Sequence, residues 1–510
     1  MPDTNLFLLR FSGEIGIKAR RTRHRFTRQI ADSIEDALAS AGVSFELERQ
    51  WSRLFVATED PEAGAVLRRV FGLQSLSPAI VRPWVDLDDI VAHGLEFFAS
   101  AVAGRRFAVR ARRTSGHPQP PFDSPAIERA LGAALLSSAA SVDLDDPEVT
   151  AGVEVHADRV YFFTDKIAGA GGLPMGIEGR ALALVSGGFD SAVAAWEIWK
   201  RGVGLDFVFF NLGGRVHEQG VVRVVERLAR DWAYGDWPRL YSVDLRPQVE
   251  TLQEKVKPRY WQLALKALMY QAADLLAAEL ELPALVTGEV IGQVSSQTLP
   301  NLLALDSTAG RPVLRPLLTW NKEQIVAAAR TIGTYELSAV VPEFCALAAR
   351  HAMTKAKADA FARSVATLDP AATARAVAGR TVREPRLPQV LPQTPGGITA
   401  DEMPTGATIV DLRSATDYHA WHWPGALNLE YFHALKVYRS VEPRSVYVLY
   451  CEVGLKSAHL AELMRAEGFD VRHVPAGLPA LRRAAKARLP RARPVARARK
   501  AARSSARPSG

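Results

Sequence analysis

The residues best suited to chemistry in this 510-residue chain form a short glycine-bearing loop, Ser186-Gly-Gly-Phe-Asp-Ser191. The loop follows the apolar run Ala181–Val185, which is typical of a buried parallel strand, and a helical pattern begins near Ser191. Glycine lets the backbone approach an anion closely, and the start of a helix offers unpaired N–H groups and partial positive charge. The pattern therefore predicts a phosphate-binding loop, with contacts from Ser186, Gly187, Gly188, Asp190 and Ser191.

Asp190 is the unusual member of this loop, because a carboxylate repels phosphate unless a cation such as Mg²⁺ lies between them. It indicates metal-assisted nucleotide chemistry. The alternative is an ordinary turn of a doubly wound sheet, in which Ser-Gly-Gly binds nothing. The loop lacks the Gly-x-x-x-x-Gly-Lys-Ser/Thr pattern, which disfavours γ-phosphate transfer. The full Ser-Gly-Gly-x-Asp-Ser pattern resembles the PP-loop of the ATP pyrophosphatases, and this resemblance implies ATP as the nucleotide and pyrophosphate as a product.

Two cysteines, Cys345 and Cys451, are too few for a disulfide scaffold or a cysteine-rich zinc site. Cys451 follows the apolar strand pattern Val446–Tyr450 and precedes a helix predicted from Ser457. Successive N–H groups can then surround its sulfur, which lowers a thiol pKa and stabilises a persulfide anion. Cys345 lies between phenylalanine and alanine, a context typical of a buried small hydrophobic residue.

The length predicts three or four domains, and 48% apolar and 23% charged residues are typical of a soluble globular protein. No apolar run approaches the roughly 20 residues that span a bilayer, and charged residues occur too early for a signal peptide. We therefore expect a cytoplasmic protein without membrane contact. The net charge of +8 arises in residues 481–510, which hold eleven Lys and Arg and no acidic residue. This tail either adds unspecific affinity for phosphate or only aids solubility.

The first half of the chain predicts two α+β units that carry clustered basic residues. Residues 5–70 follow the order strand, helix, strand, strand, helix, as in a ferredoxin-like unit. In the second unit, the strand Phe107–Arg113 alternates apolar and basic residues, and Ser124 is predicted to cap a helix with Pro125 at its first position. The alternative to RNA binding is a solvated helix face. The candidate RNA-binding residues are Lys18, Arg21, Arg25, Arg110, Arg112 and Arg113.

Several motifs resemble the tRNA 4-thiouridine synthases over nearly the whole chain. The strings Gly13–Lys18, Phe71–Leu73, Phe107–Arg113 and Asp123–Pro125 look like their ferredoxin-like and THUMP domains, and Val286–Glu289 with Gly292–Gln297 matches their PP-loop domain. The resemblance implies that the protein recognises the tRNA acceptor end and modifies uridine 8. It also implies ATP contacts by Leu184, Val185, Lys266, Gly288 and Gln297, and an essential role of Asp190 and Lys322 in adenylation. By sequence alone, Lys266 is a surface lysine and Lys322 a first-turn helix residue.

The last folded segment resembles a rhodanese domain through Ile409–Arg413, His422–Ala426 and the loop that begins at Cys451. Lys456 stands where many rhodanese loops have arginine, and Glu452 adds a negative charge beside the thiolate. The family also places a sulfur-handling cysteine at position 345. The resemblance therefore implies a transient disulfide between Cys345 and Cys451.

These observations predict a multidomain protein of the α/β and α+β classes, with a doubly wound parallel sheet in the PP-loop domain. The expected divisions are a ferredoxin-like domain at 1–75, a THUMP domain at 76–178, a PP-loop domain at 179–360, a linker at 361–397, a rhodanese domain at 398–485 and a disordered basic tail at 486–510.

The predicted function is ATP-dependent synthesis of 4-thiouridine at position 8 of tRNA, with a Cys451 persulfide as the sulfur source. The resemblance also implies a cysteine desulfurase as sulfur donor and sulfur transfer to a carrier protein for thiamine thiazole synthesis. The alternatives are a PP-loop enzyme that thiolates another tRNA position or amidates its substrate, and a non-catalytic RNA-binding sulfur carrier. A rhodanese domain argues against amidation. The oligomeric state stays open, with a dimer as one alternative.

Overall fold

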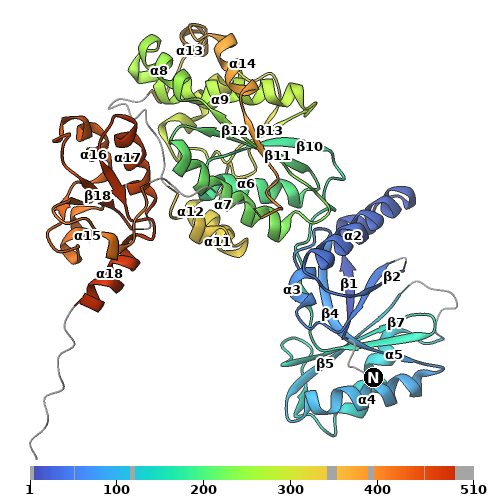
Figure 1. The fold of residues 1–510 in the computed structure, drawn as a ribbon. Helices are drawn as coiled ribbons and strands as arrows, with labels where there is room; N and C mark the ends of the chain where they lie inside the picture. The colour runs from blue at the N-terminus through green and yellow to red at the C-terminus, as the bar shows by residue number, and fades with distance from the viewer. Residues whose placement is uncertain are drawn as a thin grey trace, which may run out of the picture. The chain divides into compact units, whose positions relative to one another are not determined.

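The computed structural model describes residues 5–50, 52–114, 121–341, 353–388, 396–452 and 454–488. The chain divides into two compact units, Met1–Leu391 and Pro392–Gly510 (Figure 1). In the described residues, the first unit contains two sheets and the second unit contains one. None of the described helices is both long and apolar enough to cross a membrane.

The first sheet joins the two predicted α+β domains. Its strand order is β2-β3-β1-β4-β8-β7-β5-β6, with β9 beside β4. Strand β4 pairs with β1 through Leu73–Ala79 and with β8 through Ile80–Pro83, so the boundary predicted between residues 75 and 76 falls inside a shared strand. The elements are β1 (Asn5–Phe11), α1 (Gly13–Gly16), α2 (Arg20–Ser40), β2 (Glu46–Arg49), β3 (Arg53–Thr58), α3 (Ala63–Leu67), β4 (Leu73–Pro83), α4 (Leu87–Val102), β5 (Arg106–Arg113), α5 (Ser124–Leu135), β6 (Ser141–Val142), β7 (Val149–Val155), β8 (Arg159–Phe163) and β9 (Ile167–Ala168).

The helix predicted after Ser124 is present as α5, and Ile127, Leu131 and Leu135 are fully buried along one of its faces. The predicted cap was wrong. The Asp123 carboxylate accepts a hydrogen bond from the Ala126 N–H at 2.8 Å, so Ser124 is the first helical residue and Pro125 the second.

The second sheet has the order β14-β13-β10-β11-β12-β15, and the strands from β14 to β12 are parallel. Successive residues of β10 face opposite sides of the sheet. Leu182 packs in the core that includes α9, and Ala183 packs in the core that includes α6 and α7. Helices therefore cover both faces, which confirms the predicted doubly wound sheet. Its elements up to residue 338 are β10 (Arg180–Val185), α6 (Phe189–Lys200), β11 (Gly204–Asn211), α7 (Gly214–Trp232), β12 (Leu240–Asp244), α8 (Arg246–Lys255), η1 (Pro258–Tyr260), α9 (Trp261–Glu279), β13 (Leu285–Val286), η2 (Ser295–Gln297), α10 (Leu299–Asp306), β14 (Val313–Leu314), α11 (Lys322–Thr331) and α12 (Tyr335–Ser338).

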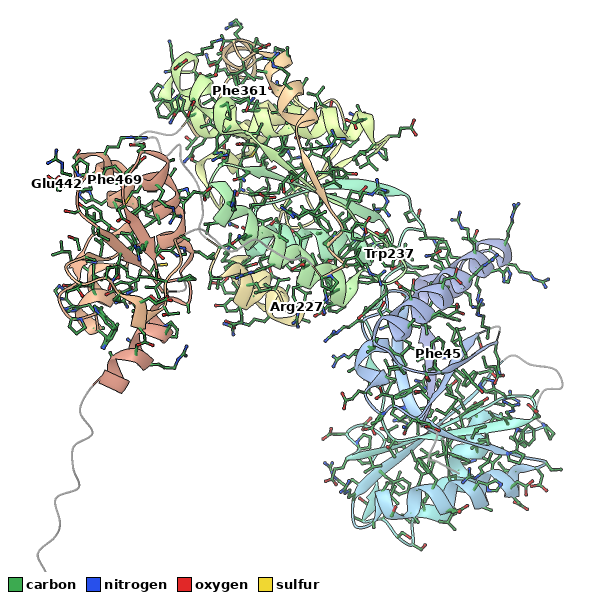
Figure 2. All side chains as sticks on the ribbon, viewed as in Figure 1. Phe45, Arg227, Trp237, Phe361, Glu442 and Phe469 are labelled. Carbon is green, nitrogen blue, oxygen red and sulfur yellow. The ribbon has the colours of Figure 1, made fainter. Side chains whose placement is uncertain are left out.

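Much of the predicted linker, residues 361–397, is instead folded onto this second sheet. It contributes to α13 (Ala358–Val365) and forms α14 (Pro370–Ala378) and β15 (Thr381–Arg383). Phe361, labelled in Figure 2, is fully buried in the core of α9. Strand β15 pairs antiparallel with β12 from Leu240 to Ser242. These alanine-rich helices bury only a few large apolar residues, Phe361 and Val365 in α13 and Val377 in α14.

Arg386 fixes the chain after β15 to the first sheet. Its guanidinium donates to both Asp36 carboxylate oxygens of α2, at 2.7 and 2.8 Å, and lies 4.2 Å from the centre of the Trp237 ring, which Figure 2 labels. Asp36 also accepts a hydrogen bond from the Gly235 N–H at 2.6 Å. The two sheets of the first unit are therefore joined by a partly buried contact that includes residue 386.

The second unit contains a parallel sheet with the order β17-β16-β18-β19, as expected for an α/β domain. Strand β18 ends immediately before Cys451. Helix α18 ends at Arg488, and most of the predicted tail, residues 489–510, lies outside the described residues. The elements are η3 (Ala400–Glu402), β16 (Thr408–Asp411), α15 (Ala415–Ala420), β17 (Leu427–Asn428), α16 (Tyr431–Val437), η4 (Tyr438–Ser440), β18 (Tyr447–Tyr450), α17 (Leu455–Ala466), β19 (Val471–His473) and α18 (Gly477–Arg488).

Candidate functional site

The predicted phosphate loop connects β10 to the start of α6. Gly187 has φ of +80°, a left-handed conformation that favours glycine. Gly188 is the N-cap of α6, and no side chain of the described residues caps the first N–H groups. These N–H groups can therefore bind an anion. The Ser191 hydroxyl donates to the Gly188 carbonyl oxygen at 3.2 Å and accepts from the Ser186 N–H at 3.3 Å, and these two hydrogen bonds stabilise the loop.

Gly288 brings the end of β13 against this loop. A Cβ atom at Gly288 would lie 2.5 Å from the Asp190 carbonyl carbon and 2.7 Å from the Ser191 nitrogen, so any larger residue would displace the loop. The carboxyl ends of β10 and β13 thus meet where parallel sheets commonly bind ligands.

The Asp190 carboxylate receives two hydrogen bonds from distant parts of the chain. Lys322 Nζ, at the first residue of α11, donates to Oδ1 at 2.8 Å. Gln293 Nε2 donates to Oδ2 at 2.7 Å. The Asp190 and Lys322 side chains are 24% and 47% exposed, so both can reach a bound molecule. The structure therefore brings together the two residues implicated in adenylation and adds Gln293, which the sequence analysis did not single out.

A buried cluster holds Lys266 close to the same strand ends. Lys266 Nζ lies 2.7 Å from Glu289 Oε1, and the other carboxylate oxygen accepts from Tyr270, Thr287 and Arg315 at 2.5, 3.3 and 2.8 Å. Burial opposes ionisation of this carboxyl, but the lysine charge and these donors together lower the pKa of Glu289 to about 2. The sequence analysis did not identify Glu289 as the partner of Lys266, although Glu289 is the last residue of the Val286–Glu289 motif.

The depressed pKa of Glu289 predicts a loss of stability in acid. The carboxylate contributes about 3 kcal/mol to the free energy of unfolding above the unfolded-state pKa, and this is lost as the pH falls from about 4.5 towards 2. Glu289→Gln should therefore be less stable than wild type at pH 6, yet lose less stability between pH 6 and pH 3. Denaturant unfolding followed by tryptophan fluorescence measures both values. Glu254→Gln, on an exposed part of α8, is the control. Parallel pH profiles for wild type and Glu289→Gln would contradict the assignment.

Gln297 lies at the end of η2, with its side chain almost completely buried. Its Oε1 atom has no hydrogen-bond partner among the described residues. A buried amide oxygen normally accepts a hydrogen bond, so this atom fits a ligand with an N–H or O–H donor. Of the other residues implicated in ATP contact, Val185 is buried and Leu184 half-buried, next to the loop at the end of β10.

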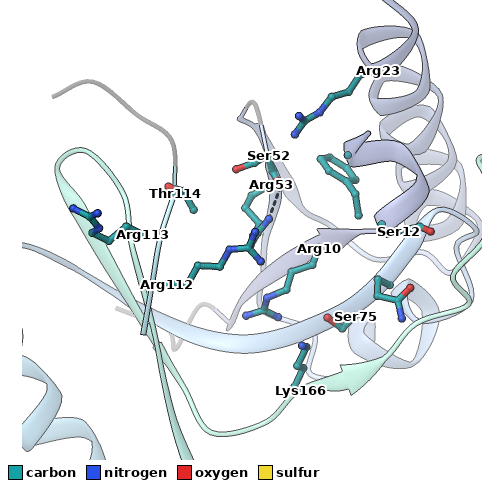
Figure 3. Close-up of a pocket in the computed structure, with 14 residues that line it drawn as sticks. Arg10, Ser12, Arg23, Ser52, Arg53, Ser75, Arg112, Arg113, Thr114 and Lys166 are labelled. Carbon is teal, nitrogen blue, oxygen red and sulfur yellow. Dashed lines mark hydrogen bonds between the residues drawn. The ribbon is translucent and has the colours of Figure 1, made fainter. Parts of the chain in front are cut away.

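A strongly basic cleft of about 800 Å³ lies in the first sheet, between β1, β3 and β5 (Figure 3). Arg112 and Arg113 are the predicted RNA-binding residues that line it. Of the other predicted residues, Lys18, Arg21 and Arg25 are exposed outside this lining, and Arg110 donates to the Leu144 carbonyl oxygen. The lining adds further cations that the sequence analysis did not select: Arg10, Arg23, Arg53 and Lys166.

Glu154 fixes two arginines of this cleft. Its carboxylate lies 2.7 Å from Arg10 Nε and 2.8 Å from Arg53 Nε, and all three side chains are buried. Burial opposes ionisation of Glu154, but the charges of Arg53 and Arg10 lower its pKa. The Nη2 atoms of Arg10 and Arg53 have no hydrogen-bond partner among the described residues. One carboxylate between two guanidinium groups leaves an excess of buried positive charge, which favours a bound anion.

Cys451 lies between β18 and α17 and is only 2% exposed. Ser457 Oγ lies 3.7 Å from its sulfur and donates to the Gly454 carbonyl oxygen at 3.0 Å. Gly454 has φ of +84°, and a Cβ there would lie 2.0 Å from the Pro475 carbonyl oxygen. The turn therefore requires glycine and places Ser457, near the start of α17, beside the thiol. The N–H groups at the start of a helix can in general stabilise an anion.

Three further residues surround this turn. Lys456 Nζ lies 5.7 Å from the centre of the Tyr431 ring, and the Tyr431 hydroxyl lies 2.7 Å from His459 Nδ1. Burial, and then the electrostatic interaction with Cys451, raise the pKa of Tyr431. Cys345 lies outside the described residues, so its disulfide with Cys451 stays a prediction. No group of three or more His, Cys, Asp and Glu residues in the described ranges is arranged to hold a metal ion.

Models of four families match separate parts of the chain. They are described as the ThiI ferredoxin-like domain over residues 6–77, the THUMP domain over 85–165, the thiamine biosynthesis protein ThiI over 176–369, and the rhodanese-like domain over 399–484.

The chain is similar to two proteins named tRNA sulfurtransferase. The protein from Pyrobaculum aerophilum is 36% identical over 458 residues, which cover 89% of this chain and 94% of that protein. The protein from Pseudomonas aeruginosa is 36% identical over 484 residues, with coverage of 89% and 96%. A crystal structure described as a 4-thiouridine synthetase–RNA complex with bound ATP matches with a TM-score of 0.63 and 30% identity, over 75% of this chain and 99% of that chain. These matches confirm the resemblance that the motifs indicated.

Proposed function

This chain belongs to the tRNA sulfurtransferase family, and on that premise we propose that it makes 4-thiouridine at position 8 of tRNA, using ATP and a persulfide on Cys451. The observation that carries the proposal is the Asp190–Lys322 pair beside an uncapped helix start. In this arrangement, cationic and N–H donors surround a position suited to a phosphate, while a second unit carries a thiol in a turn suited to an anionic sulfur.

In the first step, the 186–191 loop binds the phosphates of ATP, and the Gln297 amide oxygen accepts a hydrogen bond from the nucleotide. The O4 atom of uridine attacks the α-phosphorus, and pyrophosphate leaves. Lys322 and the first N–H groups of α6 stabilise the negative charge that develops on the phosphate oxygens. A Mg²⁺ ion that accompanies ATP would neutralise phosphate charge, and Asp190 is the carboxylate of this loop that fits it. Adenylation is useful because AMP is a better leaving group than the original oxygen.

In the second step, the terminal sulfur of the Cys451 persulfide reaches C4 of the uridine, and AMP leaves. In one route, Cys345 then attacks the inner sulfur, which forms a Cys345–Cys451 disulfide and releases 4-thiouridine. In the other route, Cys345 attacks the same inner sulfur of the persulfide earlier, and the hydrosulfide that is released adds to C4. In both routes the two thiols are oxidised to a disulfide while the sulfane sulfur is reduced. A thiol reductant must then restore the cysteines. A cysteine desulfurase would supply the persulfide, and a carrier protein for thiamine thiazole synthesis would be a second recipient of sulfur.

We assign tRNA backbone contacts to the basic cleft and to the exposed residues Lys18, Arg21 and Arg25. Arg112→Gln should weaken tRNA binding and reduce the slope of log Kd against log salt by about one, because one phosphate contact is lost. Arg110→Gln is the matched control, since Arg110 lies two residues away on β5 but outside the cleft lining. Fluorescence anisotropy over a salt series measures both. An equal loss in the two variants would show that the cleft itself is not the RNA site.

The complete proposal is tested with purified protein, tRNA transcript, ATP and a persulfide donor. Mass spectrometry of the digested tRNA should detect 4-thiouridine at position 8, with one AMP formed for each thiouridine. Thiolation at a different nucleotide would favour an enzyme that acts at another tRNA position. Persulfide uptake and tRNA binding without AMP formation would favour a non-catalytic sulfur carrier.

A further inference from the structure

Gln293 lies in a segment whose backbone is held at several points. Gly292 has φ of +76°, and its N–H donates to the Gln297 carbonyl oxygen at 2.9 Å. Asn301, which is fully buried, donates to the Ser295 carbonyl oxygen at 2.7 Å. The segment also carries Gln297, whose buried amide oxygen has no partner among the described residues. Gln293 is therefore presented by a fixed loop, even though its own side chain is exposed.

The Gln293 amide and the Lys322 ammonium each donate a hydrogen bond to a different oxygen of the Asp190 carboxylate. Gln293 Nε2 donates to Oδ2 at 2.7 Å, and Lys322 Nζ donates to Oδ1 at 2.8 Å. The two donors come from segments 103 and 132 positions away from Asp190 in the sequence. Because Oδ2 is engaged, the carboxylate cannot rotate to offer both oxygens to the lysine. Lys322 then keeps N–H groups for another acceptor, since an ammonium has three.

The charge of the donor at position 293 affects the Asp190–Lys322 pair. An amide supplies a hydrogen bond without a charge, so the opposite charges of Asp190 and Lys322 stay balanced. A cation at this position would compete with Lys322 for the carboxylate, and a residue without a donor would leave one carboxylate oxygen unpaired.

We propose that Gln293 is a positioning residue for the adenylation step: its amide holds the Asp190 carboxylate, and through it the Lys322 ammonium, in the arrangement that serves ATP. The assignment rests on the proposed function, because adenylation is the step in which this pair acts. Gln293 acts on the nucleotide through Asp190, so its removal should affect the chemical step more than the binding of substrates.

Gln293→Met keeps the length of the side chain and removes the donor. The kcat for tRNA-dependent pyrophosphate release should fall about tenfold, because a hydrogen bond to a charged group is lost, while the KM for ATP and the Kd for tRNA change less than about twofold. Gln262→Met is the matched control. The Gln262 side chain accepts a hydrogen bond from Ser295 Oγ at 2.8 Å, so this change loosens the same segment without touching Asp190. It should leave kcat close to that of wild type.

Three results would overturn the assignment. These are a wild-type kcat in Gln293→Met, an equal loss of kcat in Gln262→Met, and a raised KM for ATP at unchanged kcat. The first and third would show that the amide does not position the reacting groups, and the second would attribute the effect to the fold of the segment. Failure of the proposed function is a separate outcome, because wild-type protein would then release no pyrophosphate.

Discussion

Asp190→Ala should abolish the tRNA-dependent conversion of ATP to AMP and pyrophosphate, with a loss of at least about a thousandfold in kcat. The substitution removes the carboxylate that joins the start of α6 to Lys322 and Gln293, so the lysine loses its fixed position beside the loop. The fold should persist, because the Asp190–Lys322 pair is partly exposed and carries little of the stability. Pyrophosphate release and AMP formation, measured together, report the effect.

The Kd for tRNA is the internal control for Asp190→Ala, since the basic cleft of the first sheet is untouched. Asp190→Asn separates charge from shape, because its amide oxygen still accepts a hydrogen bond from Lys322. It should be nearly as inactive as the alanine variant if the negative charge is required. If wild-type protein produced ADP and phosphate, the pyrophosphatase mechanism itself would be wrong.

Cys451→Ser should form no 4-thiouridine, yet it should still release pyrophosphate from ATP in the presence of tRNA. The hydroxyl has nearly the shape of the thiol and keeps the neighbour Ser457, but it cannot carry a transferable sulfur. Mass spectrometry of the protein after incubation with a persulfide donor should show an added sulfur in wild type and none in the variant. Thiouridine formation by Cys451→Ser with the persulfide donor would place the transferring sulfur elsewhere.

Cys345→Ser extends this experiment to the second thiol. It should accept the persulfide on Cys451 but stall at transfer, whereas wild type without reductant should make about one 4-thiouridine per protein and accumulate a Cys345–Cys451 disulfide. Peptide mapping under non-reducing conditions detects that bond. Repeated turnover by Cys345→Ser would show that Cys345 is not needed for sulfur transfer and would favour the alternative that it is a packed core thiol.

Local sequence patterns predicted the parts of the site that are continuous in the chain. The Ser186–Ser191 loop and the Cys451 turn each need a strand end, a glycine and a helix start, and these signals lie within a few residues. The Asp190–Lys322 pair could not be derived in this way, because its members are 132 positions apart. Only the resemblance to a family connected them.

Among the residues that the sequence analysis missed, Arg10, Glu154 and Glu289 are buried charged groups, whereas Gln293 is neutral and exposed. Arg10 lies near the end of an apolar strand, so it could have been recognised as a buried charge that needs a partner. Glu154 lies between Val153 and Val155 on β7, and this alternation predicts an exposed side chain, although all three residues are buried. The pairing of Arg10 with Glu154 depends on how the strands of the first sheet are ordered, which no local pattern gives. Glu289 ends the Val286–Glu289 motif, but its partners Lys266 and Arg315 lie 23 and 26 positions away, so no local pattern connects them.

Strand β15 has a consequence for association between molecules. Without it, β12 would be an edge of the second sheet, with a row of unpaired N–H and C=O groups that can template pairing with another chain. Strand β15 covers that edge, and Arg383 on it pairs with Glu218, so the outermost strand carries charge where a β-strand from a second molecule would have to dock. On the opposite edge, β14 is only two residues long. Residues 381–383 thus occupy the edge of β12 at which a strand of a second molecule could otherwise pair.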